Sequence, residues 1–378
     1  MLHFDNLTTM ENRAPRIGMK AESLIRLREG GFNVPDGFVI TPDELRSFTD
    51  ADLAAHADEN ALYAVRSSGT SEDLGNASFA GQYTSYLNVR GLADLRAAIE
   101  NCAQSIHSDR VAAYARHNNI NIEGSKMAVI VQRMVESEIS GVAFSVDSIN
   151  GRDKEVVIEA VCGLGEQLVS GHVNPAYYSY DWYEDTFTSY KGGALSRPQV
   201  KRLAETVTDI QAYYGFPVDV EWAIAGDALF ILQSRPITTI HYKAIQGEWT
   251  AADGASAPAR KALDASLHGL VFGESEAGIF FARPYWRLRA GKNKDRYLKR
   301  MEHIWTKNQA KLRKRLEEIT ELGQAWASGG LLDCAEDIFF LSMRDIESKL
   351  SLKKKAAKNR KYYRSFINFK SPAVICGR

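Results

Sequence analysis

The sequence lacks the features that mark several special classes of protein. Its 378 residues include only four cysteines, none in a CxxC pair, which favours a reduced, cytoplasmic protein without a zinc site. No run approaches the roughly 20 apolar residues that span a bilayer, and residues 1–5 show no signal-peptide pattern. The net charge is zero, so nothing global indicates a nucleic acid or a membrane as partner.

The glycine pattern of a dinucleotide-binding unit is also missing. The nearest stretch, residues 163–171, follows strands predicted at 127–135, 140–146 and 155–160. Short turns join these strands, as in an antiparallel sheet, whereas a Rossmann site needs a strand that enters a helix in a parallel unit. The sequence therefore argues against NAD as a cofactor.

What is present is typical of a globular protein with both helices and strands. Hydrophobic residues make up 45% and charged residues 25% of the chain, and the length allows two or three domains. Short apolar runs predict further strands at 38–41 and 61–66. Apolar residues at helical spacing predict helices over 18–29, 92–118, 198–214 and 294–327.

The stretch 219–236 carries the most informative polar residues. Its alternating pattern, broken at 225–227, predicts two short strands joined by a turn. Glu221, Gln233 and Arg235 stand in this otherwise apolar hairpin. A carboxylate and an amide oxygen on paired strands suit a hard cation such as Mg²⁺, and a nearby arginine suits phosphate. For the hairpin alone, ordinary solvent-facing polar residues are the alternative.

Three further stretches suit a phosphate ligand. Lys20 stands at the start of a predicted helix, where a cation opposes the helix dipole unless an anion binds there too. Arg66 ends a predicted strand before the hydroxyl-rich loop 67–73, whose donors suit phosphate. An exposed lysine and a polar turn are the alternatives. The small, glycine-containing residues 77–83 are typical of a mobile loop over a ligand.

Taken in order, these stretches resemble a known family, the ATP-grasp nucleotide-binding domain of phosphoenolpyruvate synthase, pyruvate phosphate dikinase and rifampin phosphotransferase. The agreement is far more specific than any single motif. The segments that carry it are Gly18-x-Lys20, 34–41, 65–68, 72–73, 78–82, 132–135, 140–144, 163–166, Glu221-Trp222 and 232–237.

The resemblance implies an α+β, ATP-grasp fold with two α/β subdomains and largely antiparallel sheets. The subdomains would span residues 1–125 and 126–241. A linker and a mostly helical region, 242–378, would follow and would include an incomplete acceptor-binding part.

The resemblance also implies roles for the cations and the metal ligands. Lys20 and Arg66 would contact the phosphates of ATP, and Arg235 would hold phosphate near the point of transfer, so we expect these three to be catalytic. Glu221 and Gln233 would bind Mg²⁺.

Two more segments of the nucleotide site follow from the same resemblance. The hinge strand that begins at Gln132 would read adenine through the backbone of Met134 and Val135. A phosphate-covering loop would include Ser78, Gly81 and Gln82.

The family usually works with a swivelling domain whose histidine carries the phosphoryl group in a Gly-Gly-x-x-Ser-His-x-Ala motif. None of the eight histidines here has such a context, and we interpret His172, within Ser-Gly-His-Val-Asn-Pro, as a loop residue. The alternatives are a truncated chain, a carrier on a separate protein, or direct transfer. Truncation is favoured because residues 372–375 resemble the stretch before the family's linker.

The last third offers two motifs. Residues 333–342 resemble a Glu-Asp-Ile-Phe-Phe-Leu motif in the family's middle domain, which binds the phosphoryl acceptor. The basic run 353–361 suits either nucleic acid or a solvated helix face, and we favour the helix face.

The leading hypothesis is thus an ATP- and Mg²⁺-dependent phosphotransferase of the dikinase type. It would phosphorylate a histidine and then a small-molecule acceptor: pyruvate, an antibiotic hydroxyl or an amide nitrogen. A simple kinase and a non-catalytic, regulatory nucleotide-binding module are the alternatives.

Overall fold

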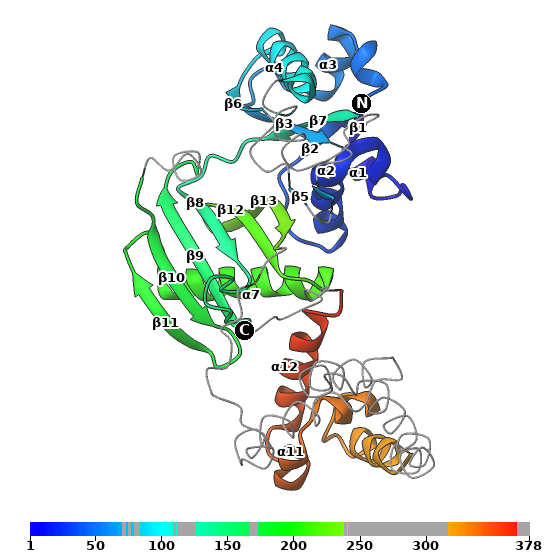
Figure 1. Cartoon of the computed structure of the whole chain (residues 1–378), viewed down its shortest axis with the longest axis vertical. Coiled ribbons are helices and arrows are strands. Elements are labelled where there is room, and N and C mark those ends of the chain that lie inside the picture. Colours follow the sequence, from blue (N-terminus) through cyan, green and yellow to red (C-terminus); the bar gives the residue numbers. More distant parts are fainter. Residues whose placement is uncertain are drawn as a thin grey trace, which may run out of the picture. The chain divides into compact units, whose positions relative to one another are not determined.

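The computed structural model describes two compact units, residues 1–243 with 365–378, and residues 244–364. The described residues are 1–69, 84–108, 111, 126–165, 173–237, 240 and 317–368, with the short strands 73–74 and 77–78. The first unit contains two antiparallel sheets, and the described part of the second unit is helical (Figure 1).

The first sheet has the strand order β1-β2-β7-β3-β6, and every pair in it is antiparallel. Strand β3 lies between β7 and β6, so Arg66 is opposite Ile130 on one side and Ser85 on the other. The bounds are β1 Leu2–His3, β2 Gly37–Ile40, β3 Tyr63–Gly69, β6 Ser85–Val89 and β7 Met127–Arg133.

Strand β7 explains why this sheet is covered on both faces. Ala128 and Ile130 belong to a core shared with α2, whereas Val129 and Val131 belong to a core shared with α3 and α4. Successive side chains of a strand point to opposite faces, so a run of apolar residues needs helices on both. The bounds of the helical elements are α1 Phe4–Leu7, α2 Ala14–Glu29, η1 Glu44–Arg46, α3 Asp50–His56, α4 Leu92–Gln104 and η2 Ser105–His107.

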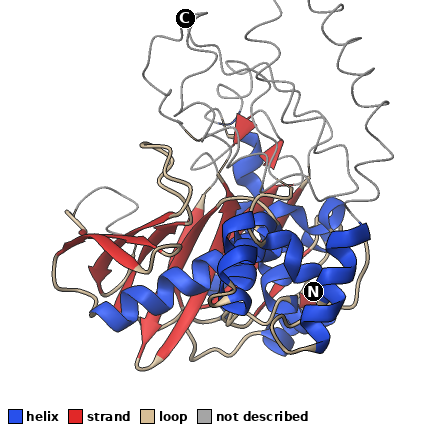
Figure 2. Ribbon diagram, turned by 90° about the horizontal axis from the view of Figure 1, so that it is seen from below, coloured by secondary structure: helices blue, strands red, loops and turns tan. Residues whose placement is uncertain are grey.

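The second sheet has the order β11-β10-β9-β8-β12-β13, again with antiparallel pairs. Helix α7 (Arg197–Tyr214) covers one face of it (Figures 1 and 2). A capping box of Ser196 and Gln199 starts α7, and Gly215 ends it with φ 78°. The strands are β8 Ile139–Phe144, β9 Glu155–Cys162, β10 Ala176–Asp181, β11 Thr186–Lys191, β12 Val218–Ala225 and β13 Ala228–Pro236.

Helix α2 connects the two sheets of the first unit. Its side chains share one hydrophobic core with residues of both sheets. The Ser23 hydroxyl donates to the Ser234 carbonyl at 2.8 Å, and the Ile231 N–H donates to the Asn33 carbonyl at 2.8 Å. These contacts fix β13 relative to α2, and hence relative to β3.

The chain returns to the first unit after the second. The Gln211 side chain in α7 donates to the carbonyl of buried Ser365 at 3.3 Å. The Asn368 backbone N–H donates to Gly215 at 2.7 Å, and its side chain donates to Tyr214 at 2.8 Å. Residues 365–368 are therefore attached to the end of α7.

In the second unit a helix covers the described residues 317–328 and ends at the predicted Gly329-Gly330. Three elements follow, η4 Ala335–Phe340, α11 Met343–Ser348 and α12 Leu352–Arg364. Trp326, Ile338 and Leu352 are among the residues of their shared core. The helical character predicted for this region is confirmed in the described part, and the predicted linker 242–284 lies outside it.

The basic run of α12 faces carboxylates of its own unit. Lys353 pairs with Asp333 at 3.0 Å, and Lys355 with Asp345 at 2.6 Å. Arg360 pairs with Asp337, which is fully buried within the predicted Glu-Asp-Ile-Phe-Phe-Leu motif. In this structure, then, that motif fastens α12 to η4.

The α+β class and the largely antiparallel sheets are confirmed by the topology. The predicted strands at 127–135, 140–146 and 155–160, the helix 198–214 and the hairpin 219–236 are also present, with small shifts of their ends. Strand β7 pairs within the first sheet, although it lies beyond residue 125, where we divided the subdomains.

Other predictions need correction. Strand β3 continues to Gly69 through its pairing with β7, so Ser67 and Ser68 are buried strand residues rather than loop residues. The helix predicted at 18–29 is present, but a helical turn that begins at Ala14 and contains Pro15 precedes it across a break at Gly18. Within the helix predicted at 92–118, α4 ends at Gln104 and the 3-10 turn η2 follows it, while residues 109–110 and 112–118 lie outside the described residues.

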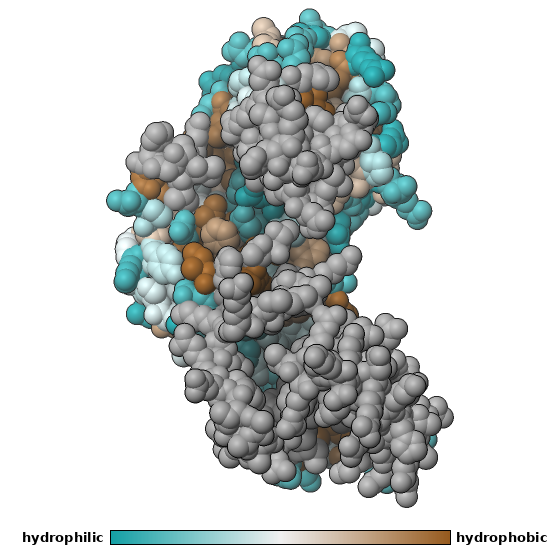
Figure 3. All heavy atoms as spheres, viewed as in Figure 1, coloured by the Kyte–Doolittle hydropathy of each residue, from teal (hydrophilic) through white to brown (hydrophobic). Residues whose placement is uncertain are grey.

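No helix in the described part of the chain is long and apolar enough to cross a bilayer. Exposed large apolar side chains such as Ile149 and Leu350 are far apart in the sequence. On the face drawn in Figure 3, hydrophobic surface shows as small patches among hydrophilic surface, as is normal for proteins.

Candidate nucleotide and metal site

The structure brings together three of the predicted site residues, from two different sheets. Arg66 Nη1 donates to Glu221 Oε2 at 3.2 Å and to Gln233 Oε1 at 3.1 Å. The side chains of Arg66 and Glu221 are 14% and 24% exposed, so both are partly shielded from water yet accessible.

The register of the hairpin explains why Glu221 and Gln233 are neighbours. Glu221 is opposite Gln233, and Asp219 is opposite Arg235, with a bulge between Glu221 and Trp222. Trp222 is fully buried in the core that includes α7. Because strand side chains alternate, Asp219 and Glu221 share the other face. Four polar side chains therefore gather on one face of β12 and β13.

Asp219 is a candidate site residue that our sequence reasoning missed. Its Oδ2 accepts from Arg235 Nη2 at 2.7 Å, and its side chain is 16% exposed. Burial raises the pKa of Asp219, the positive charge of Arg235 lowers it, and the nearby Glu221 charge raises it, with a net upward shift. The signal was its position two residues before Glu221 and directly across the hairpin from Arg235.

Lys20 is placed by a break in α2. Gly18 has φ 76° and ψ 166°, outside the helical region, and the Ala21 N–H donates to the Ser68 hydroxyl at 3.1 Å. A Cβ on Gly18 would lie 2.3 Å from the Ser68 carbonyl oxygen, so only glycine fits there. The helix thus restarts beside Ser68 of β3, two residues beyond Arg66, where the helix N-terminus and the charge of Lys20 favour an anion.

The predicted adenine hinge follows β7. Gln132 is 2% exposed, and its Nε2 has no hydrogen-bond partner among the described residues. The Met134 N–H donates to the Leu62 carbonyl at 2.8 Å, and the Val135 carbonyl accepts from Ser137 at 2.8 Å. Two of the four backbone groups of Met134 and Val135 are therefore used within the chain.

The predicted phosphate-covering loop is described only in part. Ser78 belongs to β5 (Ala77–Ser78), which pairs with β4 (Asp73–Leu74). Gly81 and Gln82 lie outside the described residues.

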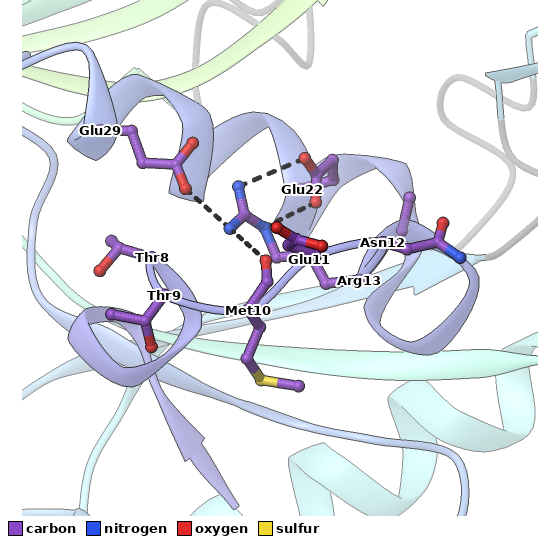
Figure 4. Close-up of a pocket in the computed structure, with 9 residues that line it drawn as sticks. Thr8, Thr9, Met10, Glu11, Asn12, Arg13, Glu22 and Glu29 are labelled. Atoms are coloured by element: carbon purple, nitrogen blue, oxygen red, sulfur yellow. Dashed lines mark hydrogen bonds and ion pairs between the residues drawn. The ribbon is translucent and has the colours of Figure 1, made fainter.

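Two other clusters of acidic side chains in the first unit are each paired with an arginine of the same unit. A pocket of about 540 Å³ is lined by residues 8–14, Glu22 and Glu29. Arg13 lies between Glu22 and Glu29 at 2.8 and 2.7 Å (Figure 4). The ligand atoms of His3, Asp5 and Asp36 lie within 4.8 Å of one another, but Arg28 pairs with both carboxylates.

Comparison with known proteins decides the family. Residues 49–191 and 183–252 match the family described as pyruvate phosphate dikinase, AMP/ATP-binding domain. This chain belongs to that family. Membership confirms the resemblance predicted from the motifs, and the matched residues include Arg66, Glu221 and Gln233.

Curated relatives carry phosphotransferase and synthase names. An uncharacterized phosphotransferase, YvkC, of Bacillus subtilis is 33% identical over 61% of this chain and 34% of its own length. The rifampicin phosphotransferase of Streptomyces sviceus is 37% identical over 53% of this chain and 26% of its length. The probable phosphoenolpyruvate synthase of Archaeoglobus fulgidus is 38% identical over 49% of this chain and 28% of its length.

The chain thus spans about a third or less of the length of these relatives. Among solved structures, it is similar to the D-alanine-D-alanine ligase of Helicobacter pylori. That match has a TM-score of 0.32 and 11% identity, over 60% of this chain and 54% of the ligase.

Proposed function

We propose that this chain binds ATP and Mg²⁺ at the face formed by β3, β12 and β13, and readies a phosphoryl group in a dikinase-type phosphotransferase. The observation that carries the proposal is the convergence of Glu221 and Gln233 on one nitrogen of Arg66. Membership in the AMP/ATP-binding family supports the nucleotide.

The donor set suits Mg²⁺. The Glu221 carboxylate and the Gln233 amide present hard oxygen atoms to a single cationic nitrogen, at 3.2 and 3.1 Å, and Mg²⁺ prefers oxygen ligands of this kind. Glu221 and Gln233 would hold the ion, which when bound neutralises charge on the phosphates.

The cations around this point would position the phosphates. Phosphoryl transfer depends on positioning and charge neutralisation more than on covalent chemistry by the protein. Arg66 and Lys20 would contact the phosphates from the side of β3, and Arg235 would hold phosphate from the hairpin while Asp219 orients its guanidinium.

The nucleotide base would lie against the hinge after β7. We assign its recognition to the Met134 carbonyl and the Val135 N–H, because the Met134 N–H and the Val135 carbonyl are bonded within the chain. The unpartnered, buried Gln132 amide supports a polar ligand nearby. Ser78, Gly81 and Gln82 complete the proposal as the loop that covers the phosphates.

The phosphoryl group would pass to a histidine on a phosphocarrier domain and then to a small-molecule acceptor in the cytoplasm. The names of the rifampicin phosphotransferase and phosphoenolpyruvate synthase relatives support phosphotransfer that involves a small molecule, and the histidine step rests on the family resemblance alone. Direct phosphorylation of a small molecule is the alternative for an ATP site of this kind.

Phosphorus-31 NMR of MgATP with this protein tests the proposal, with and without a family histidine domain added. Formation of AMP and phosphate with the histidine domain supports the dikinase reaction, whereas ADP indicates a simple kinase. Binding without turnover in every mixture indicates a regulatory module.

Turnover by Arg235→Ala, compared with a control variant, tests whether this site catalyses the reaction. Turnover should fall about 10²-fold, as for the loss of one preorganised electrostatic contact. Arg96→Ala, which breaks an exposed pair with Asp50, serves as the control and should leave turnover unchanged. Near-wild-type turnover of Arg235→Ala would contradict the assignment.

A further inference from the structure

We infer that Arg66 occupies the metal position in the nucleotide-free protein and makes metal binding conditional on the nucleotide. The inference rests on the proposed function and adds a control step to it. Arg66 would be an internal cation that Glu221 and Gln233 exchange for the metal ion.

The first support is the identity of the partners. Arg66 is separated from Glu221 by 155 residues and from Gln233 by 167 residues, yet it binds the two oxygen donors that suit Mg²⁺. An arginine guanidinium stays charged at any pH at which proteins fold. A fixed positive charge about 3 Å from both ligands repels a divalent ion, so the metal is excluded while Arg66 stays there.

The second support is the position of Arg66 in a paired strand. Its backbone lies between β7 and β6, opposite Ile130 and Ser85. The strand therefore stays in place, and release of Glu221 and Gln233 needs only a rotation of the Arg66 side chain. The side chain is 14% exposed, so it borders the accessible face of the site.

The third support is the separate pairing of Asp219. This carboxylate binds Arg235 at 2.7 Å. The two arginines thus divide the polar face of the hairpin: Arg235 takes Asp219, and Arg66 takes Glu221 and Gln233.

A nucleotide offers Arg66 a better partner. Guanidinium groups bind phosphate through two parallel hydrogen bonds, which are stronger than bonds to a neutral amide. When Arg66 turns to a phosphate, Glu221 and Gln233 are released for the metal. Nucleotide and metal should therefore strengthen each other's binding by the same factor.

The experiment measures Mn²⁺ binding, by the electron paramagnetic resonance signal of free Mn²⁺, with and without a non-hydrolysable ATP analogue. Without nucleotide, Arg66→Gln should bind Mn²⁺ about tenfold more tightly than the wild type, because the excluding charge is gone. With nucleotide, the wild type should bind Mn²⁺ tightly, and the gain that nucleotide gives should be smaller in Arg66→Gln.

Three variants control the interpretation. Arg66→Lys keeps the charge and should show no gain in Mn²⁺ affinity without nucleotide. Arg66→Gln combined with Glu221→Gln should lose the gain, because it lacks a metal ligand. Arg96→Gln breaks another arginine–carboxylate contact of the first unit and should behave like the wild type. Thermal melting of each variant verifies that it is folded.

The outcomes separate this inference from the proposed function. If wild type and Arg66→Gln bind Mn²⁺ equally without nucleotide, and both bind it tightly through Glu221 with nucleotide, the exchange is wrong and the ATP site stands. If neither binds Mn²⁺ in a Glu221-dependent way with nucleotide present, both ideas fail. If Arg66→Gln is unfolded, Arg66→Met, which also removes the charge, takes its place: a gain in Mn²⁺ affinity without nucleotide supports the inference, and no gain overturns it.

Discussion

Two arginine–carboxylate pairs in this protein differ in how completely they are satisfied. Asp337 in the second unit is fully buried and accepts from Arg360 and from the backbone N–H groups of Asp333 and Cys334. Glu221 in the first unit is 24% exposed and accepts from Arg66 at 3.2 Å. A buried carboxylate with several donors stabilises one structure, whereas a partly exposed carboxylate can exchange its partner.

The carboxylates around these pairs differ in the same way. Asp345 in the second unit accepts from Ser342 and Lys355, and these contacts outweigh burial and lower its pKa. At Asp219 burial outweighs the attraction of Arg235 and raises the pKa. Contacts therefore favour the charged form of Asp345, whereas burial disfavours the charged form of Asp219, and perturbed pKa values cluster at functional sites.

The largest expected effect is the loss of the buried pair. Asp337→Ala should lower the free energy of unfolding, measured by urea denaturation, by about 3–5 kcal/mol, because Arg360 and two N–H groups lose their partner. Affinity for an ATP analogue should not change. Asp333→Ala, which removes an exposed partner of Lys353, is the control and should change stability by less than about 1 kcal/mol. Equal stability of the two variants would remove the contrast between the units.

The next effect concerns the close packing beside Lys20. Gly18→Ala should destabilise the protein by about 2–3 kcal/mol, because strained backbone is combined with overpacking against Ser68. Affinity for the ATP analogue should also fall. Gly31 has a similar φ of 80°, but a Cβ added there would meet no described residue other than its chain neighbours within 4 Å. Gly31→Ala should therefore cost about 1 kcal/mol and leave affinity unchanged. If the two variants match in both measurements, the contact with Ser68 does not position Lys20.

The smallest effects are opposite in sign and depend on pH. The raised pKa of Asp219 means that its contribution to stability is present below the unfolded pKa, about 3.9, and is lost as pH rises through the folded value. Asp219→Asn should therefore gain stability relative to the wild type as pH rises from acid to neutral.

Asp345 should behave in the reverse way, because its pKa is lowered. Its contribution is present above about pH 3.9 and is lost as pH falls through the folded value. Asp345→Asn should be less stable than the wild type at neutral pH and approach it in acid. Melting temperatures across this range provide the measurement, and parallel curves for the two variants would contradict both pKa shifts.

The strongly patterned elements could be predicted from the sequence. The alternation in 219–236 and the turn at 225–227 predicted both strands of the hairpin, but the pairing of Glu221 with Gln233 depends on a bulge between Glu221 and Trp222 that the pattern does not show. The periodic apolar residues of 198–214 likewise predicted α7. In these segments local pattern and burial agree.

The remaining features depend on contacts that no local pattern encodes. Strands β6, β10 and β11 were missed because β6 and β11 are mostly exposed or half-buried, and β10 combines tyrosines with Ser179. Ser67 and Ser68 were read as a loop, although pairing with β7 makes them strand. The contact of Arg66 with Glu221 joins two sheets, so no local pattern predicts it. Asp219 was missed because attention went to Glu221, the acid two residues later.

The attachment of residues 365–368 to the end of α7 has a consequence for synthesis of the chain. The Gln211–Ser365 contact spans 154 residues. At about 5–20 residues per second, the ribosome needs roughly 8–30 seconds between making the two partners. During that time the second unit is synthesised, and the end of α7 lacks its contacts with residues 365–368. The first unit therefore completes its fold only after the second unit has been synthesised.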